Sequence, residues 1–185
     1  MQILNQAIDV LNNGGIILYP TETVWGIGCL TNNSKSIDNL YKLKNRNKLK
    51  KFILLIGDDN KLNRYVKEVP EVAWDLIDYS EKQPTIIYPN AKNLPEVLIA
   101  KDKSIAIRII NSGPLQQLLR KIDSPLISTS ANLSNDPPAL KLKEVSKDIL
   151  SKVDFILDLP EIIGANRPSA IIKLETNGEV EIIRK

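Results

Sequence analysis

The segment at residues 19–28, Tyr-Pro-Thr-Glu-Thr-Val-Trp-Gly-Ile-Gly, places hydroxyls and small residues where a strand is expected to end. Thr21 and Thr23 share a face if the chain stays extended there, and Gly26 and Gly28 would let the backbone approach a ligand closely. Ligands of open α/β sheets bind at such strand ends. The alternative is a simple turn whose hydroxyls satisfy local backbone groups, and an isolated pair of threonines more often has that role.

A cationic stretch at residues 42–51 contains six basic side chains and no acidic one. In a chain rich in lysine, most of these are expected to form a solvated face. Arg46 differs from the lysines, because its planar guanidinium can hold a phosphate or carboxylate through two parallel hydrogen bonds. Lys44 and Lys50 lie close enough in sequence to add point charges to such an anion site.

Two further candidates lie in the second half of the chain. The run Ser-Thr-Ser-Ala-Asn at 128–132 directly follows an apolar segment, and its hydroxyls and amide could hold phosphate or ribose oxygens. A local turn that satisfies its own backbone is an equal alternative. Arg108 lies inside the apolar strand expected at 105–110, where a charge is costly unless it is paired or binds an anion. Ligand contact and a structural salt bridge are both left open for Arg108.

The composition removes several kinds of chemistry. The chain has no histidine, which excludes Ser–His, Cys–His and His–metal mechanisms, and its single cysteine, Cys29, excludes an internal disulfide. Catalysis must therefore use Lys, Arg, carboxylates, hydroxyls or a metal held largely by the substrate. The net charge of +3, from 25 basic and 22 acidic residues, suits a small anionic ligand and does not imply wholesale wrapping of nucleic acid.

The length and the first residues favour one domain in the cytoplasm. A chain of 185 residues, 43% of them apolar, can bury one core, so we expect a single domain over residues 1–185. The first 13 residues include Asp9 and lack a long apolar run or a basic start. Neither a signal peptide nor a membrane span is expected from them.

The candidate residues must be positioned by an alternation of helices and strands. Periodicity predicts helices around residues 4–11, 37–41, 69–77, 115–122 and 142–149, and strands at 16–19, 52–56, 85–88, 105–110, 125–128, 155–159, 170–174 and 180–184. Asn177-Gly178 is a strong hairpin signal between the last two strands, so the sheet is mixed. Residues 132–138 and 160–169 are expected to be surface loops. The order of elements indicates one α/β domain whose sheet is covered by helices.

Taken in order, several of these motifs resemble the YrdC-like family of threonylcarbamoyl-AMP synthases. They are Pro-Thr-Glu-Thr-Val-Trp-Gly-Ile-Gly, Lys-Asn-Arg-x3-Lys, the strand arginine Arg108 and Ser-Thr-Ser-Ala-Asn, and the likeness runs from Gly14 to Ile183-Arg184. The resemblance implies a YrdC-like fold, with a twisted mixed sheet and a concave basic groove. It also implies the reaction of L-threonine, bicarbonate and ATP, with Mg²⁺, to threonylcarbamoyl-AMP and pyrophosphate. The product would pass to the transferase machinery that makes N6-threonylcarbamoyladenosine (t6A) in tRNA.

The family pattern also implies a role for individual residues. Those implied to hold threonine and its carbamate are Thr23, Arg108, Ser128 and Ser169, and those implied to hold ATP are Lys44, Arg46, Lys50, Ser130, Asn132 and Arg184. No single catalytic group is implied, since Arg46, Lys50 and Arg108 would position and neutralise charge, and no metal ligand from the protein is implied beyond the Mg²⁺ that the nucleotide carries. The chain departs from the family pattern at residues 82–85, Leu55 and Ala170, and these departures concern the threonine pocket most.

Two other functions remain as alternatives. The cationic stretch at 42–51 would suit a non-catalytic RNA-binding module, and it also leaves a weak tRNA contact open. A diverged paralogue that forms carbamoyl-adenylate is the second alternative. The related carbamoyltransferases of hydrogenase maturation carry acylphosphatase-like and zinc-finger parts, for which this chain has neither the length nor the cysteines.

Overall fold

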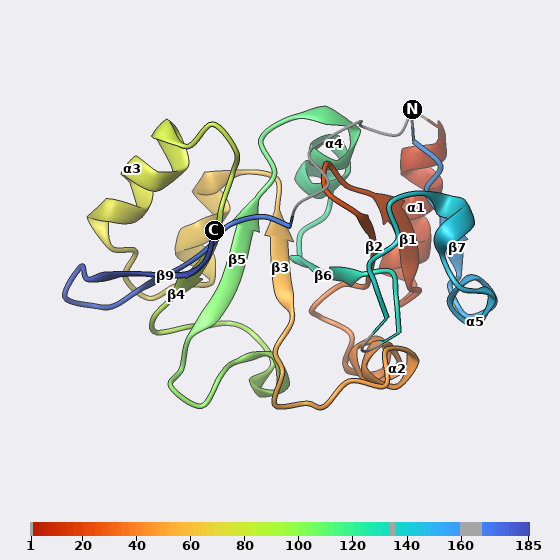
Figure 1. The fold of residues 1–185 in the computed structure, drawn as a ribbon, viewed down its shortest axis with the longest axis horizontal. Helices are drawn as coiled ribbons and strands as arrows, with labels where there is room; N and C mark the ends of the chain where they lie inside the picture. Colours follow the sequence, from red (N-terminus) through yellow and green to blue (C-terminus); the bar gives the residue numbers. More distant parts are fainter. Residues whose placement is uncertain (1, 134–135, 160–167) are drawn as a thin grey trace.

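The computed structural model describes residues 2–133, 136–159 and 168–185. In these residues one mixed sheet has the strand order β7-β1-β2-β6-β3-β5-β4-β8-β9. The sheet is twisted, so that the strand direction rotates from one edge to the other (Figure 1). The strands are β1 Ile17–Pro20, β2 Trp25–Gly28, β3 Ile53–Ile56, β4 Thr85–Tyr88, β5 Ile105–Ile109, β6 Leu126–Ser130, β7 Phe155–Ile156, β8 Ile171–Leu174 and β9 Val180–Arg184. The sheet contains parallel pairs such as β3–β5 and antiparallel pairs such as β1–β2, which confirms the expected mixed α/β sheet.

Helices cover both faces of this sheet. They are α1 Gln2–Asn12, α2 Ser34–Leu43, α3 Glu71–Tyr79, α4 Gly113–Lys121 and α5 Lys147–Leu150, with the short 3-10 helices η1 Asp59–Arg64, η2 Glu96–Leu98 and η3 Leu142–Glu144. Side chains of a strand alternate between the faces. Ile17 and Tyr19 of β1 therefore join the core under α1 and α4, while Leu18 joins the core under α2 and α3.

Capping side chains and turn glycines determine where several of these helices and strands begin or end. Helix α2 begins where the side chain of Asn33 accepts a hydrogen bond from the Ser36 amide at 3.0 Å. The turn after α1 uses Gly14, whose φ of +82° is a conformation that only glycine adopts without strain. Gly178, at φ +85°, has the same function in the β8–β9 turn, which confirms the predicted hairpin.

The structure corrects the expected boundaries in three places. Residues 25–28 form strand β2, and β6 continues through Ser130, so residues 128–130 lie within a strand and not in a loop after it. The helix expected at 142–149 is divided into η3 and α5, because Val145 and Ser146 are extended and Ser146 caps a new helix. Strand β7 covers only Phe155–Ile156 of the expected 155–159. Of the expected loops, residues 134–135 and 160–167 lie outside the described part of the chain.

Strand β6 joins the two halves of the sheet. It pairs with β2 through Ser130 and Thr129, and with β3 through residues 126–128. The approach of β2 to β6 is close at Gly28, because a Cβ there would lie 1.8 Å from the carbonyl oxygen of Ile127. The close backbone approach expected at Gly28 is therefore to a neighbouring strand and not to a ligand. In the described residues, no helix is long and apolar enough to cross a membrane.

Candidate active site

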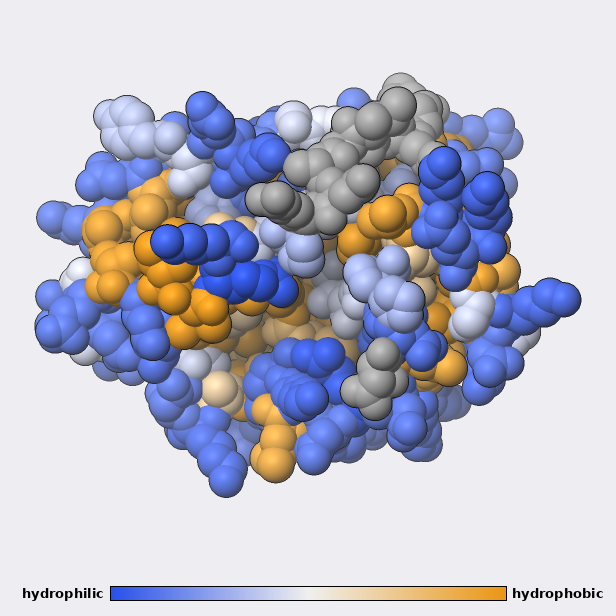
Figure 2. Space-filling view, viewed as in Figure 1, coloured by the Kyte–Doolittle hydropathy of each residue, from blue (hydrophilic) through white to orange (hydrophobic). Residues whose placement is uncertain are grey.

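A cavity of about 510 Å³ lies over the middle of the sheet. Its floor is formed by every second residue of neighbouring strands, whose side chains lie on the same face of the sheet. Ser128 of β6 is opposite Ile53 of β3 there, and Arg108 of β5 is opposite Leu55 of β3. The β1–β2 loop and the ends of β8 and β9 form its walls, and the space-filling view shows this face hollowed near its centre (Figure 2). The sequence-predicted site residues that line the cavity are Thr23, Arg46, Arg108, Ser128, Ser130, Ser169 and Arg184.

The floor of the cavity is largely apolar. Ile53 and Leu55 of β3 lie beside Ala106 of β5, and Leu55 is opposite Arg108 in the strand register. Charged groups above such a floor interact more strongly than in bulk water, because the local dielectric constant is lower. Leu55 therefore contributes an apolar surface directly beside a cation.

Arg108 is 7% exposed and has two partners. Its Nη2 donates to the carboxylate of Glu22 in the β1–β2 loop, and its Nε donates to the Gln83 carbonyl at 3.0 Å. Burial lowers the pKa of the guanidinium, and Glu22 opposes that shift. Arg108 thus forms the salt bridge that the sequence left open, and it also lines the cavity; its contact with a ligand stays a prediction.

Glu22 is a site residue that the sequence reasoning missed. A buried arginine signals that an acid lies nearby, but Glu22 and Arg108 are separated by 86 positions. Only the lateral order of the strands brings the β1–β2 loop over β5. Gln83, in the segment that departs from the family pattern, was missed in the same way because its contribution is a backbone carbonyl.

The two threonines of the β1–β2 loop have different surroundings. The Thr21 hydroxyl donates to the Val24 carbonyl at 2.6 Å and accepts from the amides of Thr23 and Val24 at 3.2 and 3.1 Å. Thr21 therefore stabilises its own turn. Thr23 contacts it at 3.0 Å between the hydroxyl oxygens.

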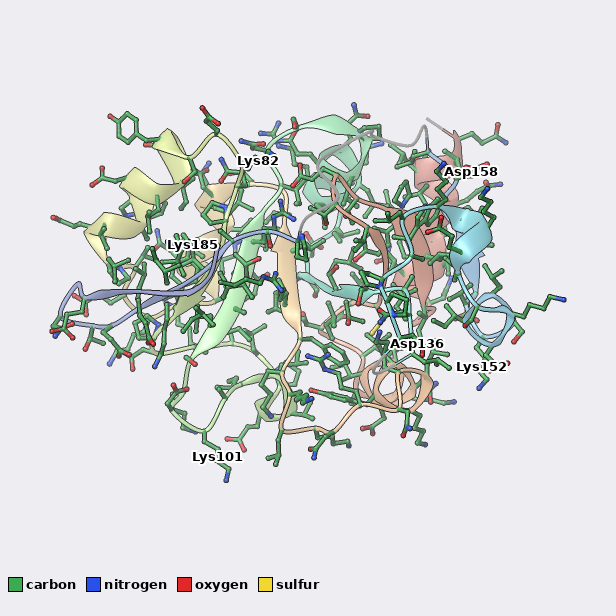
Figure 3. The ribbon with its side chains drawn as sticks, in the orientation of Figure 1. Lys82, Lys101, Asp136, Lys152, Asp158 and Lys185 are labelled. Carbon is green, nitrogen blue, oxygen red and sulfur yellow. The ribbon has the colours of Figure 1, made fainter. Side chains whose placement is uncertain are left out.

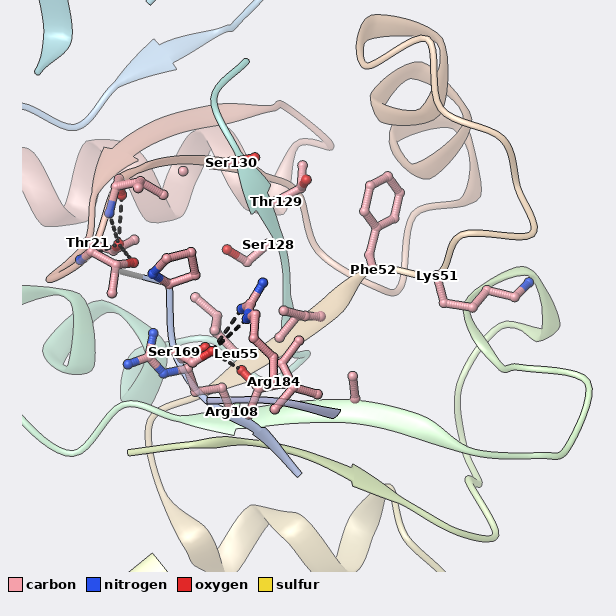
Figure 4. A pocket seen from close by; sticks show the side chains of 18 of the residues that line it. Thr21, Lys51, Phe52, Leu55, Arg108, Ser128, Thr129, Ser130, Ser169 and Arg184 are labelled. Carbon is pink, nitrogen blue, oxygen red and sulfur yellow. Dashed lines mark hydrogen bonds between the residues drawn. The ribbon is translucent and has the colours of Figure 1, made fainter. Parts of the chain in front are cut away.

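Hydroxyls from three other strands and segments converge on the cavity. Ser128 of β6 accepts a hydrogen bond from the buried phenol of Tyr19 at 2.7 Å. On the opposite wall, Ser169 contacts the Thr85 hydroxyl at 2.9 Å, and Arg184 donates to the Ser169 carbonyl from Nε at 3.1 Å and from Nη2 at 2.8 Å (Figure 4). Arg184 therefore ties the end of β9 to the segment before β8.

Arg46 holds the turn that follows α2. Its Nε donates to the Lys50 carbonyl at 2.9 Å and its Nη2 to the Lys51 carbonyl at 2.8 Å. The guanidinium also stacks on Phe52, with its central carbon 5.0 Å from the ring centroid, a favourable cation–π contact. Lys50 contributes its carbonyl to this turn but its side chain does not line the cavity, and Lys51 points away toward the Val97 carbonyl (Figure 4).

Lys44 lies behind the cavity at the end of α2 and is only 2% exposed. Its ammonium donates to the Ser130 carbonyl at 2.7 Å, to the Asn132 side-chain oxygen at 3.2 Å and to the Asn132 carbonyl. Burial, together with the charge of Arg46, lowers the pKa of Lys44 to about 8. The Asn132 amide group donates within its own loop, to the Leu133 and Asp136 carbonyls. Lys44 and Asn132 therefore hold the end of β6 in place and do not line the cavity.

The described residues contain no group of three or more acidic, cysteine or histidine side chains that could hold a metal ion. The cavity instead presents guanidinium groups at several points of its wall, with hydroxyls between them. Such an arrangement can bind a molecule with separated anionic groups and neutralise charge that develops on it.

Known proteins share both the sequence and the fold. The model of the Sua5/YciO/YrdC family, described as "Telomere recombination", matches residues 9–185. Threonylcarbamoyl-AMP synthase of Pseudoalteromonas translucida is 33% identical over 177 residues, with 94% of each chain covered. The enzyme of the same name from Blochmanniella floridana is 34% identical over 180 residues, with 96% of this chain and 93% of that protein covered.

Solved structures agree with these matches. E. coli YciO has a TM-score of 0.81 at 25% identity, covering all of this chain and 89% of that one. P. abyssi Sua5 complexed with L-threonine has a TM-score of 0.82 at 26% identity over 92% of this chain, which spans only half of that longer chain. HypF in a phosphate- and nucleotide-bound form shares the fold alone, at 20% identity and over 28% of its length. The family model, the full-length relatives and the shared fold together show that this chain belongs to the Sua5/YciO/YrdC family.

Proposed function

We propose that the groove is where this chain forms threonylcarbamoyl-AMP from L-threonine, bicarbonate and ATP. Relatives about 33% identical over 94% of the chain carry the name of that enzyme, and the chain is a threonylcarbamoyl-AMP synthase, an ATP-dependent nucleotidyltransferase of the t6A pathway. The observation that carries the proposal for the groove is its lining, in which Arg46, Arg108 and Arg184 surround an apolar floor with hydroxyls between them.

L-Threonine and its carbamate would occupy the part of the groove around Arg108. The guanidinium there is buried and already oriented by the Gln83 carbonyl, so a carboxylate would meet a donor that needs little reorganisation. Thr23, Ser128 and Ser169 line the same cavity with hydroxyls that can reach the remaining polar atoms of the ligand. A solved structure of P. abyssi Sua5 contains L-threonine, which supports this ligand class.

ATP would extend along the side of the groove lined by Arg46, Ser130 and Arg184. Arg46 is held flat by Phe52 and by two carbonyls, which presents a fixed cation to a phosphate. The exposed side chain of Lys50 is close enough in sequence to turn toward the same phosphates. Lys44 and Asn132 would act indirectly, by fixing the backbone that carries Ser130.

The reaction suits a site without histidine. The neutral amine of threonine attacks the carbon of bicarbonate, whose hydroxyl leaves as water with a proton from the amine, to give the carbamate, and a carbamate oxygen then displaces pyrophosphate from the α-phosphorus of ATP. Such a transfer depends mainly on positioning and charge neutralisation, which arginines supply. Mg²⁺ would accompany the triphosphate and screen its charge, and the cationic and hydroxyl lining fits a metal held by phosphate oxygens.

The alternative of an RNA-binding module finds less support. Four of the basic side chains in residues 42–51, those of Lys44, Arg46, Lys48 and Lys51, donate to acceptors of the protein itself. Other lysines, such as Lys101 and Lys152, lie at separate places on the outer edge of the molecule and do not form one cluster (Figure 3). A weak tRNA contact therefore remains a lesser proposal, and we place the enzyme in the cytoplasm, where its product would pass to the t6A transferase machinery.

The test is to incubate the purified chain with ATP, L-threonine, bicarbonate and Mg²⁺. We expect threonine-dependent pyrophosphate and threonylcarbamoyl-AMP, detected by mass spectrometry. Carbamoyl phosphate should not replace threonine and bicarbonate. If carbamoyl phosphate did so, the chain would be a carbamoyl-adenylate former, and if no acyl-adenylate formed at all, the proposal would be wrong.

Two arginine variants then test which substrate binds at which end of the groove. Arg46→Ala should raise the KM for ATP by about tenfold or more, and Arg108→Ala should do the same for L-threonine, because each loses a charged hydrogen-bond donor. Arg120, which pairs with Asp58 outside the groove, provides the matched control Arg120→Ala with unchanged kinetics. Equal effects of both groove variants on both substrates would contradict the assignment of the two ends.

A further inference from the structure

Tyr19 reaches across a neighbouring strand to contact the groove. It lies on β1, while Ser128 lies on β6, and β2 separates these two strands in the sheet. The phenol oxygen of Tyr19 nevertheless lies 2.7 Å from the Ser128 hydroxyl oxygen. Tyr19 is fully buried and belongs to the core under α1 and α4, whereas Ser128 is partly exposed and lines the cavity.

The glycines of β2 make room for this contact. Gly26 pairs with Tyr19 on one side and with Ser130 on the other. A Cβ at Gly26 would lie 3.1 Å from the Tyr19 ring, and a Cβ at Gly28 would lie 3.3 Å from the phenol oxygen. The sequence Trp-Gly-Ile-Gly therefore leaves a channel over β2 through which the tyrosine side chain passes.

The proton between the two oxygens belongs to Tyr19. Burial raises the pKa of the phenol well above its usual value, so the group is always protonated. A buried phenol proton needs an acceptor, and the Ser128 hydroxyl oxygen is the acceptor found for it among the described residues. Only one proton can lie between the two oxygens, so the Ser128 proton points elsewhere. Within the described residues, the Ser128 hydroxyl has no other hydrogen-bond partner, and Ser128 lines the floor of the cavity (Figure 4).

We propose that Tyr19 is a positioning residue that turns the Ser128 hydroxyl into a hydrogen-bond donor directed at the groove. No other hydrogen-bond partner of Ser128 is found among the described residues, so a molecule bound in the groove can accept the Ser128 proton. Carboxylate, carbamate and phosphate oxygens are the acceptors that suit a cavity also lined by arginines. The identity of that molecule rests on the proposed function, whereas the position of the proton does not.

The position of the proton can be read directly by neutron diffraction from a crystal of the perdeuterated, ligand-free protein. We expect one deuteron on the phenol, on the line between Tyr19 and Ser128, and the Ser128 deuteron directed into the groove. A Ser128 deuteron directed at Tyr19 would overturn the proposal. This measurement needs no substrate, so it decides the proposal even if the proposed function fails.

Kinetics then test whether Tyr19 acts through Ser128. Tyr19→Phe keeps the ring but frees the serine hydroxyl to rotate, so the KM for L-threonine should rise about three- to tenfold while kcat stays within about twofold. A purely structural role would instead lower kcat through loss of folded enzyme. Tyr65→Phe is the matched control, because that buried phenol donates to the Asp123 carbonyl at 3.1 Å, away from the groove.

The double variant gives the decisive comparison. In a Ser128→Ala background, Tyr19→Phe should change the KM for L-threonine by less than about twofold, because the residue through which it acts is gone. The same fold-change in both backgrounds would show that Tyr19 acts independently, and the proposal would be wrong. A wild-type chain that forms no threonylcarbamoyl-AMP would refute the proposed function, and the neutron result alone would then decide the role of Tyr19.

Discussion

At the scale of single residues, the pair formed by Glu22 and Arg108 is the most consequential contact of the groove. The guanidinium side chain is 8% exposed and the carboxylate is 43% exposed, so one partner is buried and the other is half in water. Removal of the carboxylate leaves a buried cation with the Gln83 carbonyl as its remaining contact among those described above. The pair therefore both stabilises the β1–β2 loop and keeps Arg108 oriented.

The cost of breaking this pair can be measured. Glu22→Gln should lower the free energy of unfolding by about 1–3 kcal/mol, because a buried charge loses its counter-charge. The control is Asp38→Asn, which breaks the pair with Lys48, whose side chains are 51% and 59% exposed. That change should cost clearly less than Glu22→Gln, because solvent screens an exposed pair. Urea denaturation measures both, and equal losses would show that Arg108 does not depend on Glu22.

Lys44 should make stability depend on pH in a defined window. Its pKa is about 8 in the folded protein and 10.5 as the ordinary value, so between these values the unfolded chain binds more protons than the folded one. Stability from this residue therefore rises with pH from about 8 to about 10.5, by at most about 1.4 kcal/mol per pH unit. Unfolding free energies measured from pH 7 to 10 should increase relative to Lys44→Met. A difference between the two proteins that is constant over this range would contradict the lowered pKa.

The sequence was a better guide to which arginines line the cavity than to the atoms that these arginines contact. Arg46, Arg108 and Arg184 were predicted as site residues, and all of them line the cavity. Their partners were not predictable, because the Lys50 and Ser169 carbonyls that Arg46 and Arg184 hold are backbone atoms, which any residue type provides. The sequence indicates a cation that needs an anion or acceptor, but it does not show which loop supplies one.

At the scale of elements, the contact between β2 and β6 brings the two halves of the site together. Residues 25–28 were expected to be a loop, since two glycines in four positions are typical of turns and weaken a strand. In the structure these glycines permit the close approach of β6 and the passage of Tyr19. Helices and strands with clear periodicity, such as α1, α4 and β5, were predicted correctly, because their apolar side chains repeat with the period of the element.

Gly28→Ala tests this contact. The added methyl group would lie 1.8 Å from the Ile127 carbonyl oxygen, which is backbone and can move only if β6 shifts, so we expect a loss of about 3 kcal/mol or more in unfolding free energy. Gly178→Ala is the control. Its methyl group meets nothing within 4 Å, and only the φ of +85° is unfavourable, so the loss should be about 1 kcal/mol. Chemical denaturation that ranked these two variants in the opposite order would show that β2 and β6 adjust freely.

At the scale of the whole molecule, the groove is lined by both halves of the sheet. Thr23 and Ser128 belong to the β1–β2–β6 half, and Arg108, Ser169 and Arg184 belong to the half that contains β5, β4, β8 and β9. The sequence could not predict this arrangement, because the lateral order of strands depends on tertiary packing and leaves no local signal. Only the resemblance to a family, which implied a groove and its residues, brought these residues together in advance.

Ligands that bridge the two halves should stabilise the whole fold. ATP or L-threonine at about one hundred times its dissociation constant adds roughly 2.7 kcal/mol, which for a chain of this size raises the melting temperature by roughly 5–10 °C. Arg46→Ala should reduce the shift produced by ATP by about half or more at the same ATP concentration, and keep the shift produced by threonine, in a thermal-melt titration of each ligand. Loss of both shifts in that variant would indicate general misfolding and not loss of one end of the groove.

The lining of the groove also determines when it can exist during synthesis. Its residues extend from Thr21, near the start of the sequence, to Arg184 on β9. A nascent chain synthesised only as far as β6 already contains the hydroxyls of Thr23 and Ser128, but it lacks Ser169 and Arg184 of the opposite side. Residue 184 must therefore leave the ribosome before all the lining residues can meet, and a chain truncated before β9 lacks the guanidinium that Arg184 contributes to the groove.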